Sequence, residues 1–224
     1  MRSKILIALS TFAVLLLIRN LYVMLLDFPD EVQQGGVFRI MFFHIPAAFT
    51  SLVAPFCAVA ASILYLVRKE LKYDSLAAAI TEVGLAFGMI NIITGMIWGR
   101  IIWGIWWAWD ARLTSTLVLM LIYAGYLMLR QAIEDPTQRA RMSGILSVFA
   151  AADVPIVWYS IEWWRTQHPQ PVLRAGGSIP GEWRSMIFTN WIPFLILGIV
   201  FVMIRMNQEQ TQRRLEAVRR EAYA

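Results

Sequence analysis

Six long apolar segments constrain the fold of this chain more than any other feature of its sequence. Each holds close to the roughly 20 apolar residues that a helix needs to cross a bilayer. They lie at about residues 5–26, 45–67, 77–98, 113–130, 141–161 and 187–206. Because lipid offers no hydrogen-bond partners to an open backbone, continuous apolar segments of this length form helices. The sequence therefore predicts an all-α integral membrane protein, with one six-helix transmembrane domain over residues 1–206 and a basic cytoplasmic tail over residues 207–224.

The charged residues support this prediction and orient the helices. They make up 16% of the 224 residues, against about 25% in soluble domains. The first apolar segment lacks an A-x-A-like cleavage site, so we interpret it as a retained span rather than a signal peptide. With a cytoplasmic N-terminus, thirteen of the 20 lysines and arginines lie inside, six lie outside, and Arg19 lies within the first span. The positive-inside rule then places both termini in the cytoplasm.

All ten tryptophans then lie on the outer side, in or beside two connections between spans. Five of them lie in WGRIIWGIWWAWDARL, the outer loop between the third and fourth spans at residues 98–113: Trp98, Trp103, Trp106, Trp107 and Trp109. If this stretch is helical, positions 103, 106, 107 and 110 share one face, which puts three indoles beside the carboxylate of Asp110. An interfacial belt of tryptophans decorates both membrane surfaces. The one-sided distribution therefore favours a dedicated site for a large planar ligand.

The two histidines of the chain lie on the same outer side. His44, in FRIMFFHIPAAF, stands at the outer mouth of the second span, where Pro46 fits the first helical turn. His168, in EWWRTQHPQPVLRAGG, lies in the long connection between the fifth and sixth spans, which its prolines and glycines keep irregular. Five of the six outer arginines lie in the same two connections, against the topology rule. These candidates to meet an anion are Arg100, Arg112, Arg165, Arg174 and Arg184.

Two imidazoles, a set of indoles and several arginines together match haem. Histidine nitrogen is a usual axial ligand of haem iron. An indole face covers an apolar ring by stacking and burial, and arginine binds a carboxylate through a bidentate fork. The sequence therefore predicts a haem site at the outer face, with the outer arginines as partners of the propionates. A metal site built from the two histidines and Asp110 stays open, because their spacing is not diagnostic.

Other features bound the chemistry. Asp153 lies within the fifth span, where a carboxylate is costly; it either hydrogen-bonds to Asn91 or Thr94 of the third span or is protonated. No CxxCH motif is present for covalent haem, and no GxxxxGK[ST] motif is present for ATP. Any ATP hydrolysis therefore belongs to a partner subunit. With no HExxH, GxSxG or paired-carboxylate motif, we expect no enzymatic activity, and we expect no nucleic-acid partner.

The sequence also resembles a known family. WGRIIWGIWWAWDARLTS resembles the tryptophan-rich WWD signature of membrane haem-handling proteins. Further segments resemble those of the haem exporter protein C family, also called cytochrome c maturation protein C, in order and over nearly the whole chain: FFHIPAAF, NIITGMIWG, WGIWWAWDARLTS, ADVPIV and IEWWRTQHP. Phe49 departs from the pattern, because tryptophan is expected after HIPAA.

The resemblance implies a role in the maturation of c-type cytochromes. Members of this family hold b-type haem transiently at the periplasmic face of the bacterial cytoplasmic membrane. With a small single-span membrane partner they present it to a membrane-anchored haem chaperone, and an ABC-type ATPase with its own membrane subunit drives release of the loaded chaperone. The axial histidines of the family correspond to His44 and His168. Its WWD motif corresponds to Trp103, Trp106, Trp107, Trp109 and Asp110.

Two other functions stay open at this stage. A membrane electron-transfer cytochrome would hold haem permanently between two histidines, usually buried within helices, whereas His168 lies in a loop. A ligand-free structural subunit would use its aromatic loops to dock a partner. A haem spectrum separates the structural subunit from the other two, and the sequence leaves open whether haem is also moved across the bilayer.

Overall fold

The computed structural model describes residues 2–169 and 179–223, and it confirms the predicted fold class. Six helices are long and apolar enough to cross a membrane, and the described residues form no strand. The helices are α1 (Arg2–Tyr22), α2 (Met41–Arg68), α3 (Leu71–Ile102), α4 (Ala111–Ala132), α5 (Pro136–Trp163) and α6 (Gly181–Tyr223). A π-helical turn, η1 (Val23–Asp27), continues α1, and a 3₁₀ turn, η2 (Gly36–Ile40), leads directly into α2.

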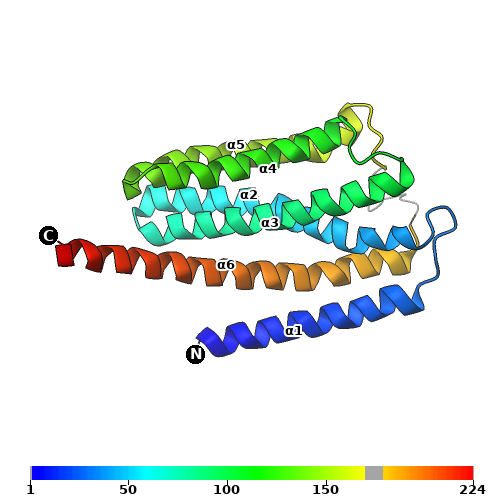
Figure 1. Ribbon diagram of the computed structural model, residues 1–224, viewed down its shortest axis with the longest axis horizontal. Coiled ribbons are helices and arrows are strands. Elements are labelled where there is room, and N and C mark those ends of the chain that lie inside the picture. Colours follow the sequence, from blue (N-terminus) through cyan, green and yellow to red (C-terminus); the bar gives the residue numbers. More distant parts are fainter. Residues whose placement is uncertain (1, 170–178, 224) are drawn as a thin grey trace.

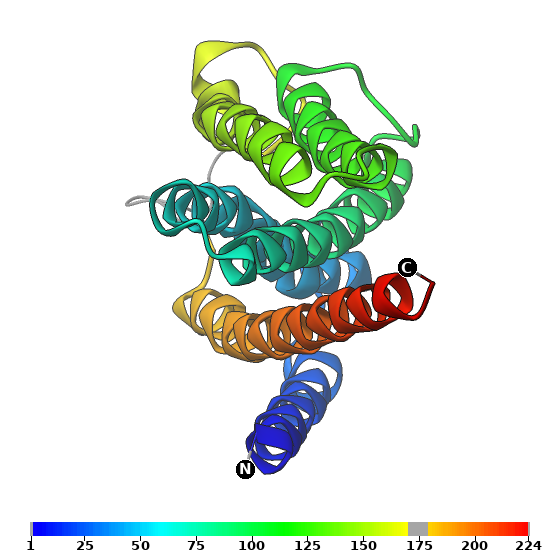
Figure 2. The same ribbon diagram turned by 90° about the vertical axis from the view of Figure 1, so that its left-hand side faces the viewer.

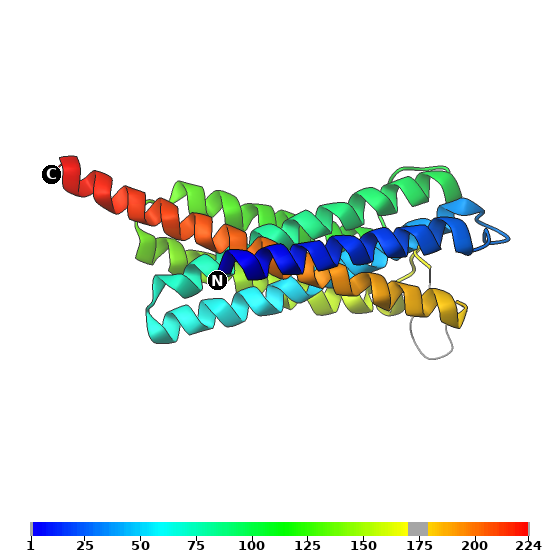
Figure 3. The same cartoon turned by 90° about the horizontal axis from the view of Figure 1, so that it is seen from below.

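Consecutive helices run antiparallel, so the bundle has two distinct ends (Figure 1). Both termini lie at one end, which we call the terminal end. The α3–α4 and α5–α6 connections lie at the opposite end, which we call the loop end. In the view of Figure 2, α2 and α3 form the centre, with α4 and α5 on one side and α6 and then α1 on the other. At the terminal end α6 continues past the other helices, so the tail predicted after residue 206 extends this helix (Figure 3).

The prediction that Pro46 lies in the first turn of its helix is wrong. The helix begins at Met41, directly after η2, so Pro46 lies inside it. The helical conformation extends this far because Phe38 and Phe42 are fully buried at the loop end, where Phe38 stacks on Trp183 of α6 with ring centroids 4.3 Å apart.

Three of the four prolines that lie inside helices, Pro46, Pro55 and Pro193, each leave a carbonyl that a neighbouring helix satisfies. Because proline has no N–H, the carbonyl four residues earlier loses its helical donor. The carbonyl of Phe42, freed by Pro46, accepts a hydrogen bond from Nδ2 of Asn190 in α6 (2.5 Å). In turn Oδ1 of Asn190 accepts one from Asn20 of α1 (3.2 Å). A chain of buried amides therefore joins α1, α6 and α2.

The other two prolines follow the same rule. The carbonyl of Ser51, freed by Pro55, accepts a hydrogen bond from the hydroxyl of Tyr123 in α4 (2.9 Å). The carbonyl freed by Pro193 in α6 accepts a hydrogen bond from Asn20 (3.4 Å). Neighbouring helices commonly satisfy such groups in membrane proteins, and here they connect α2 to α4 and α6 to α1.

The terminal end is closed by a buried ionic network. Asp74 of α3, which is 3% exposed, binds Arg130 of α4 through both carboxylate oxygens (2.6 and 3.1 Å). Arg213 of α6 binds the same carboxylate (2.6 Å), and Glu209 accepts from both arginines (3.3 and 3.1 Å). Two positive and two negative side chains therefore tie α3, α4 and α6 together.

Candidate functional site

The tryptophan-rich segment does not form the helical face that its spacing predicts. The helix α3 ends at Ile102, and residues 103–110 are irregular. Gly104 follows the helix with a φ of +77°, a left-handed conformation that commonly terminates helices. The indoles are instead arranged in edge-to-face pairs. Trp98 and Trp103 lie 5.0 Å apart between ring centroids, and Trp107 and Trp109 lie 5.7 Å apart.

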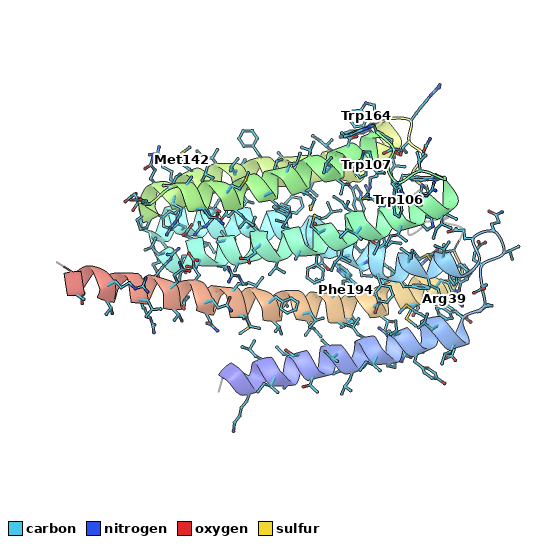
Figure 4. The ribbon with its side chains drawn as sticks, in the orientation of Figure 1. Arg39, Trp106, Trp107, Met142, Trp164 and Phe194 are labelled. Carbon is cyan, nitrogen blue, oxygen red and sulfur yellow. The ribbon has the colours of Figure 1, made fainter. Side chains whose placement is uncertain are left out.

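Much of the indole surface at the loop end is open. Trp106 is 56% exposed and Trp109 is 79% exposed. At the end of α5, Trp163 and Trp164 are also more than half exposed. Figure 4 shows that Trp106, Trp107 and Trp164 come from the two connections and gather at this end. Trp107 is half-buried, and its Nε1 is buried without an acceptor among the described residues.

His44 lies between α2 and α3, in a setting that fixes its tautomer. Its Nδ1 is 3.1 Å from Oγ1 of Thr94. The single hydroxyl hydrogen of Thr94 is directed to the helix carbonyls, Ile90 O at 2.6 Å being the nearer. The Thr94 oxygen therefore accepts a hydrogen bond from Nδ1, which leaves Nε2 unprotonated, with a lone pair that can accept. A β-carbon at Gly95 would lie 3.0 Å from Cε1 of His44, so this glycine allows the close approach of the ring.

Asn91 of α3 contacts the same imidazole. Its Nδ2 lies 3.2 Å from Nε2, 3.3 Å from Nδ1 and 3.3 Å from the carbonyl oxygen of His44. With Nδ1 protonated, the amide donates to Nε2 and to the carbonyl. Thr94 thus contacts His44 in the way that outer groups orient metal-ligating histidines. Asn91 occupies Nε2 itself, so its amide must move away before a metal binds there.

His168 has the same tautomer. Its Nδ1 lies 2.9 Å from the carbonyl oxygen of Pro169, which can only accept, so Nδ1 carries the hydrogen and Nε2 is free. Burial and then the positive charge of Arg112 lower the pKa of His168 from 6.5 to about 4, although Pro169 and Asp110 oppose this shift. The imidazole is therefore neutral at neutral pH, as a metal ligand must be.

The two histidines and Arg112 lie within electrostatic range of one another. The positive charge of Arg112 acts on both His44 and His168, and a proton on His168 would act on His44. Arg112 is half-buried and donates to the carbonyl of Val157 in α5 (2.5 Å). The structure thus brings together two histidines separated by more than 120 positions in the chain.

The other candidate arginines are spread around this centre. Arg165 lines an open cavity of about 330 Å³ between the two connections, together with Trp109 and Asp110. Arg100 donates to the carbonyl of Gly104. Arg184, in the first turns of α6, is half-buried, and its Nε has no partner among the described residues. Arg174 lies outside the described residues.

Asp110 joins the two connections. Its Oδ1 accepts a hydrogen bond from the backbone of Leu113 (2.8 Å), which caps the N-terminus of α4. Its Oδ2 accepts from the hydroxyl of Thr166 (2.6 Å) and from the backbone of Gln167 (3.1 Å). Among the described residues it forms no ion pair with Arg112.

The hydrogen bond expected between Asp153 and α3 is absent from the described part of the chain. Asn91 and Thr94 bind His44 instead, and Oδ2 of Asp153 is buried without a partner. Of the two alternatives that the sequence left open for Asp153, the hydrogen bond to Asn91 or Thr94 is therefore not formed. A polar pair within the apolar run NIITGM was the available signal, but spacing alone could not identify the helix that it faces.

The side chains gathered here can be matched to the ligands that a metal ion or haem iron requires. Within the described ranges, no group of three or more His, Cys, Asp or Glu side chains is placed to hold a metal ion. Two imidazoles with unprotonated Nε2 atoms are the donors that haem iron takes from a protein, because the porphyrin nitrogens fill its other positions. The residues present therefore fit haem, with exposed indoles and arginines nearby.

Known proteins are similar to this chain over most of its length. Residues 1–221 match the family described as "Heme exporter protein C". A protein of that name from Bradyrhizobium diazoefficiens is 37% identical over 219 residues, covering 97% of this chain and 81% of the relative. The one from Escherichia coli is 37% identical over 179 residues (80% and 73%), and that from Paracoccus denitrificans is 32% identical over 198 residues (85% and 80%). The chain is a multi-pass membrane protein that belongs to the Heme exporter protein C family.

Proposed function

We propose that this protein binds haem as a transient cargo at the loop end and presents it to a membrane-anchored haem chaperone. Membership of the family supports a role in haem handling for cytochrome c maturation. One observation carries the site. Histidines from a helix and from a distant loop come within electrostatic range, and each has its Nδ1 bound to an oxygen and its Nε2 unprotonated. On His44 this Nε2 accepts a hydrogen bond from Asn91 (3.2 Å), which iron would displace.

In this proposal the histidines, indoles and arginines of the loop end each have a separate role. His44 and His168 supply axial nitrogens to the iron. The open indoles cover the porphyrin faces. The arginines of the two connections pair with the propionates. The four that lie within the described residues, Arg100, Arg112, Arg165 and Arg184, form no ion pair there, whereas Arg39 at the same end pairs with Asp30. A helix-borne ligand on one side and a loop-borne ligand on the other suit a cargo that is taken up and given away.

The proposed site lies on the periplasmic side of the bacterial inner membrane. The distribution of lysines and arginines supports a cytoplasmic terminal end. In a Cys57→Ala background, Gln33→Cys at the loop end should react with an impermeant thiol reagent in intact cells, whereas Glu134→Cys at the terminal end should not. The reverse pattern would place the tryptophans in the cytoplasm and overturn the proposal.

The chain is proposed to act with partners and without enzymatic activity of its own. The family name supports a place in an ABC-type exporter complex, whose ATPase and second membrane subunit, with a small single-span protein, would supply energy and scaffolding. Co-purification with each partner tests this assignment. If the chain hydrolysed ATP by itself, the division of labour would be wrong.

The spectrum of the purified protein tests the haem site directly. Two axial histidines give a low-spin spectrum, and each single alanine variant at His44 or His168 should lose it. The double variant should no longer load the chaperone in cells that express both proteins. Unchanged low-spin spectra in both single variants would show that the ligands lie elsewhere. A protein that never binds haem would favour a structural subunit, and one that keeps haem through chaperone loading would favour an electron-transfer cytochrome.

A further inference from the structure

A hydrogen-bonded chain connects the WWD motif to one of the proposed axial ligands. The hydroxyl of Thr166 has one hydrogen, which it donates to Oδ2 of Asp110 (2.6 Å). Its oxygen then accepts a hydrogen bond from the backbone N–H of His168 (3.0 Å). The backbone N–H of Gln167, between these two residues, donates to the same carboxylate oxygen (3.1 Å). Three consecutive residues of the histidine loop are therefore held, directly or through one hydroxyl, by a single carboxylate.

This carboxylate is itself fixed to a helix. Its other oxygen accepts from the backbone N–H of Leu113, so Asp110 caps α4 while it holds the loop. The described part of the loop has little other support, since its backbone bonds to the backbone of α5 only at Trp164 (3.2 Å to the carbonyl of Ser160). The position of the loop is thus set mainly by the N-terminus of α4.

We infer that Asp110 and Thr166 are positioning residues, which hold the backbone of His168 so that its imidazole stands at the haem site. The inference rests on the proposed function and extends it, because it gives the acidic residue of the WWD motif a role in ligation. We call the three hydrogen bonds that join Asp110, Thr166, Gln167 and His168 the aspartate clasp. Opening the clasp releases the loop-borne ligand while the helix-borne ligand, His44, stays in place.

Matched substitutions separate this role from simple capping. Asparagine caps helices as well as aspartate does, so Asp110→Asn keeps the hydrogen bond from Leu113. Its amide nitrogen cannot accept from Thr166 or Gln167, so the clasp is lost. Thr166→Val removes the hydroxyl at nearly constant volume, and Thr166→Ser retains it as the control. A hydrogen bond to a charged group has a sizeable net effect, and we expect haem affinity to fall on the order of tenfold in Asp110→Asn and Thr166→Val.

The spectra should identify the bond that is lost. Both clasp variants should show the one-histidine spectrum of His168→Ala, and Thr166→Ser should stay low-spin. In a His168→Ala background, Thr166→Val should cause no further loss of affinity, because the clasp acts through His168. A low-spin spectrum and unchanged affinity in Thr166→Val would overturn the inference. So would an undiminished effect of Thr166→Val when His168 is absent.

A measurement without haem keeps this test independent of the proposed function. Amide hydrogen exchange of the haem-free protein should show faster exchange at Gln167 and His168 in Asp110→Asn and Thr166→Val than in wild type or Thr166→Ser. Exchange in α4 should not change. If wild type binds no haem, the proposed function fails, while unchanged exchange at these two amides would disprove the clasp itself.

Discussion

At the terminal end, Arg130 and Arg213 share the buried carboxylate of Asp74 and also bind Glu209. At the loop end, the four candidate arginines within the described residues form no ion pair there, and two of them, Arg100 and Arg112, donate to backbone carbonyls. The terminal-end arginines have used their charge to join helices. The charges of these four arginines have no carboxylate partner among the described residues, which leaves them available for the propionates of the proposed haem site.

Polar residues within the bundle also fall into two groups: some stabilise helix packing, and others contact a proposed haem ligand. Asn20 and Asn190 are fully buried and satisfy carbonyls that prolines have freed, so they stabilise helix packing. Asn91 and Thr94 instead bind the imidazole of His44, one of the two proposed axial ligands. Residue type alone does not separate a structural asparagine from one that orients a ligand. The group at the other end of the hydrogen bond does.

Breaking the terminal network should give the largest loss of stability. Asp74→Asn leaves two buried arginines with one fewer counter-charge, which costs about 3–5 kcal/mol of unfolding free energy. Detergent-unfolding titrations measure this loss, and the haem spectrum of the folded variant should not change. The control is Glu82→Gln, whose bond to Arg205 is about two-fifths exposed on each side and should contribute less than about 1 kcal/mol. Equal losses in the two variants would contradict the structural role of the network.

Removing indoles at the loop end should lower haem affinity and leave stability nearly unchanged, the reverse of what we expect for Asp74→Asn. Replacing Trp103, Trp106 and Trp107 together with alanine removes three aromatic contacts of about 1 kcal/mol each, so haem affinity should fall roughly 100-fold. The bundle should still unfold at nearly the same detergent concentration. Trp191→Phe is the control, because that indole donates to Thr50 inside the bundle (3.2 Å). If the triple variant binds haem and loads the chaperone normally, these tryptophans are only an interfacial belt.

The amide chain at the loop end should affect stability without affecting haem. Asn190→Ala leaves the carbonyl of Phe42 and the amide of Asn20 without their partner, which costs about 1–3 kcal/mol. Tyr123→Phe removes the hydroxyl that donates to the carbonyl of Ser51 and should lower the free energy of unfolding by a similar amount. Unfolding titrations test both, and the haem affinity of each variant serves as the readout that should stay constant. A stability equal to wild type would show that other groups satisfy the carbonyls freed by proline.

The smallest expected effect concerns pH. A proton and iron compete for Nε2 of His168, and a lowered pKa favours iron. With a pKa of about 4, ligation should be insensitive to pH between 7 and 5.5 and should weaken as pH falls towards 4. Arg112→Gln removes part of the cause and should move the spectral midpoint upwards, whereas Arg112→Lys keeps the charge and should not. A wild-type midpoint near 6.5 would mean that His168 is not buried beside a positive charge.

The sequence by itself determined the six helices, the distribution of bases between the two ends, and the segments that carry the family resemblance. These follow from hydropathy, charge and motif spacing, which are properties of neighbouring residues. It also singled out His44, His168 and Asp110 as candidates. It could not show that residues 103–110 leave the helix, because a glycine permits a left-handed turn without requiring it.

Only the tertiary structure decided which side chains meet. The partners of His44 lie about 50 positions along the chain, and Thr166, the partner of Asp110, lies 56 positions away. Such pairs depend on the rotation and depth at which helices pack, which the apolar pattern leaves free because lipid-facing and buried positions in a membrane helix are both apolar. Helix packing likewise determines which hydrogen-bond donor reaches a carbonyl that proline has freed. Polar groups in the bundle bind whichever polar group packing brings within 3 Å, since leaving them unpaired in an apolar environment is costly.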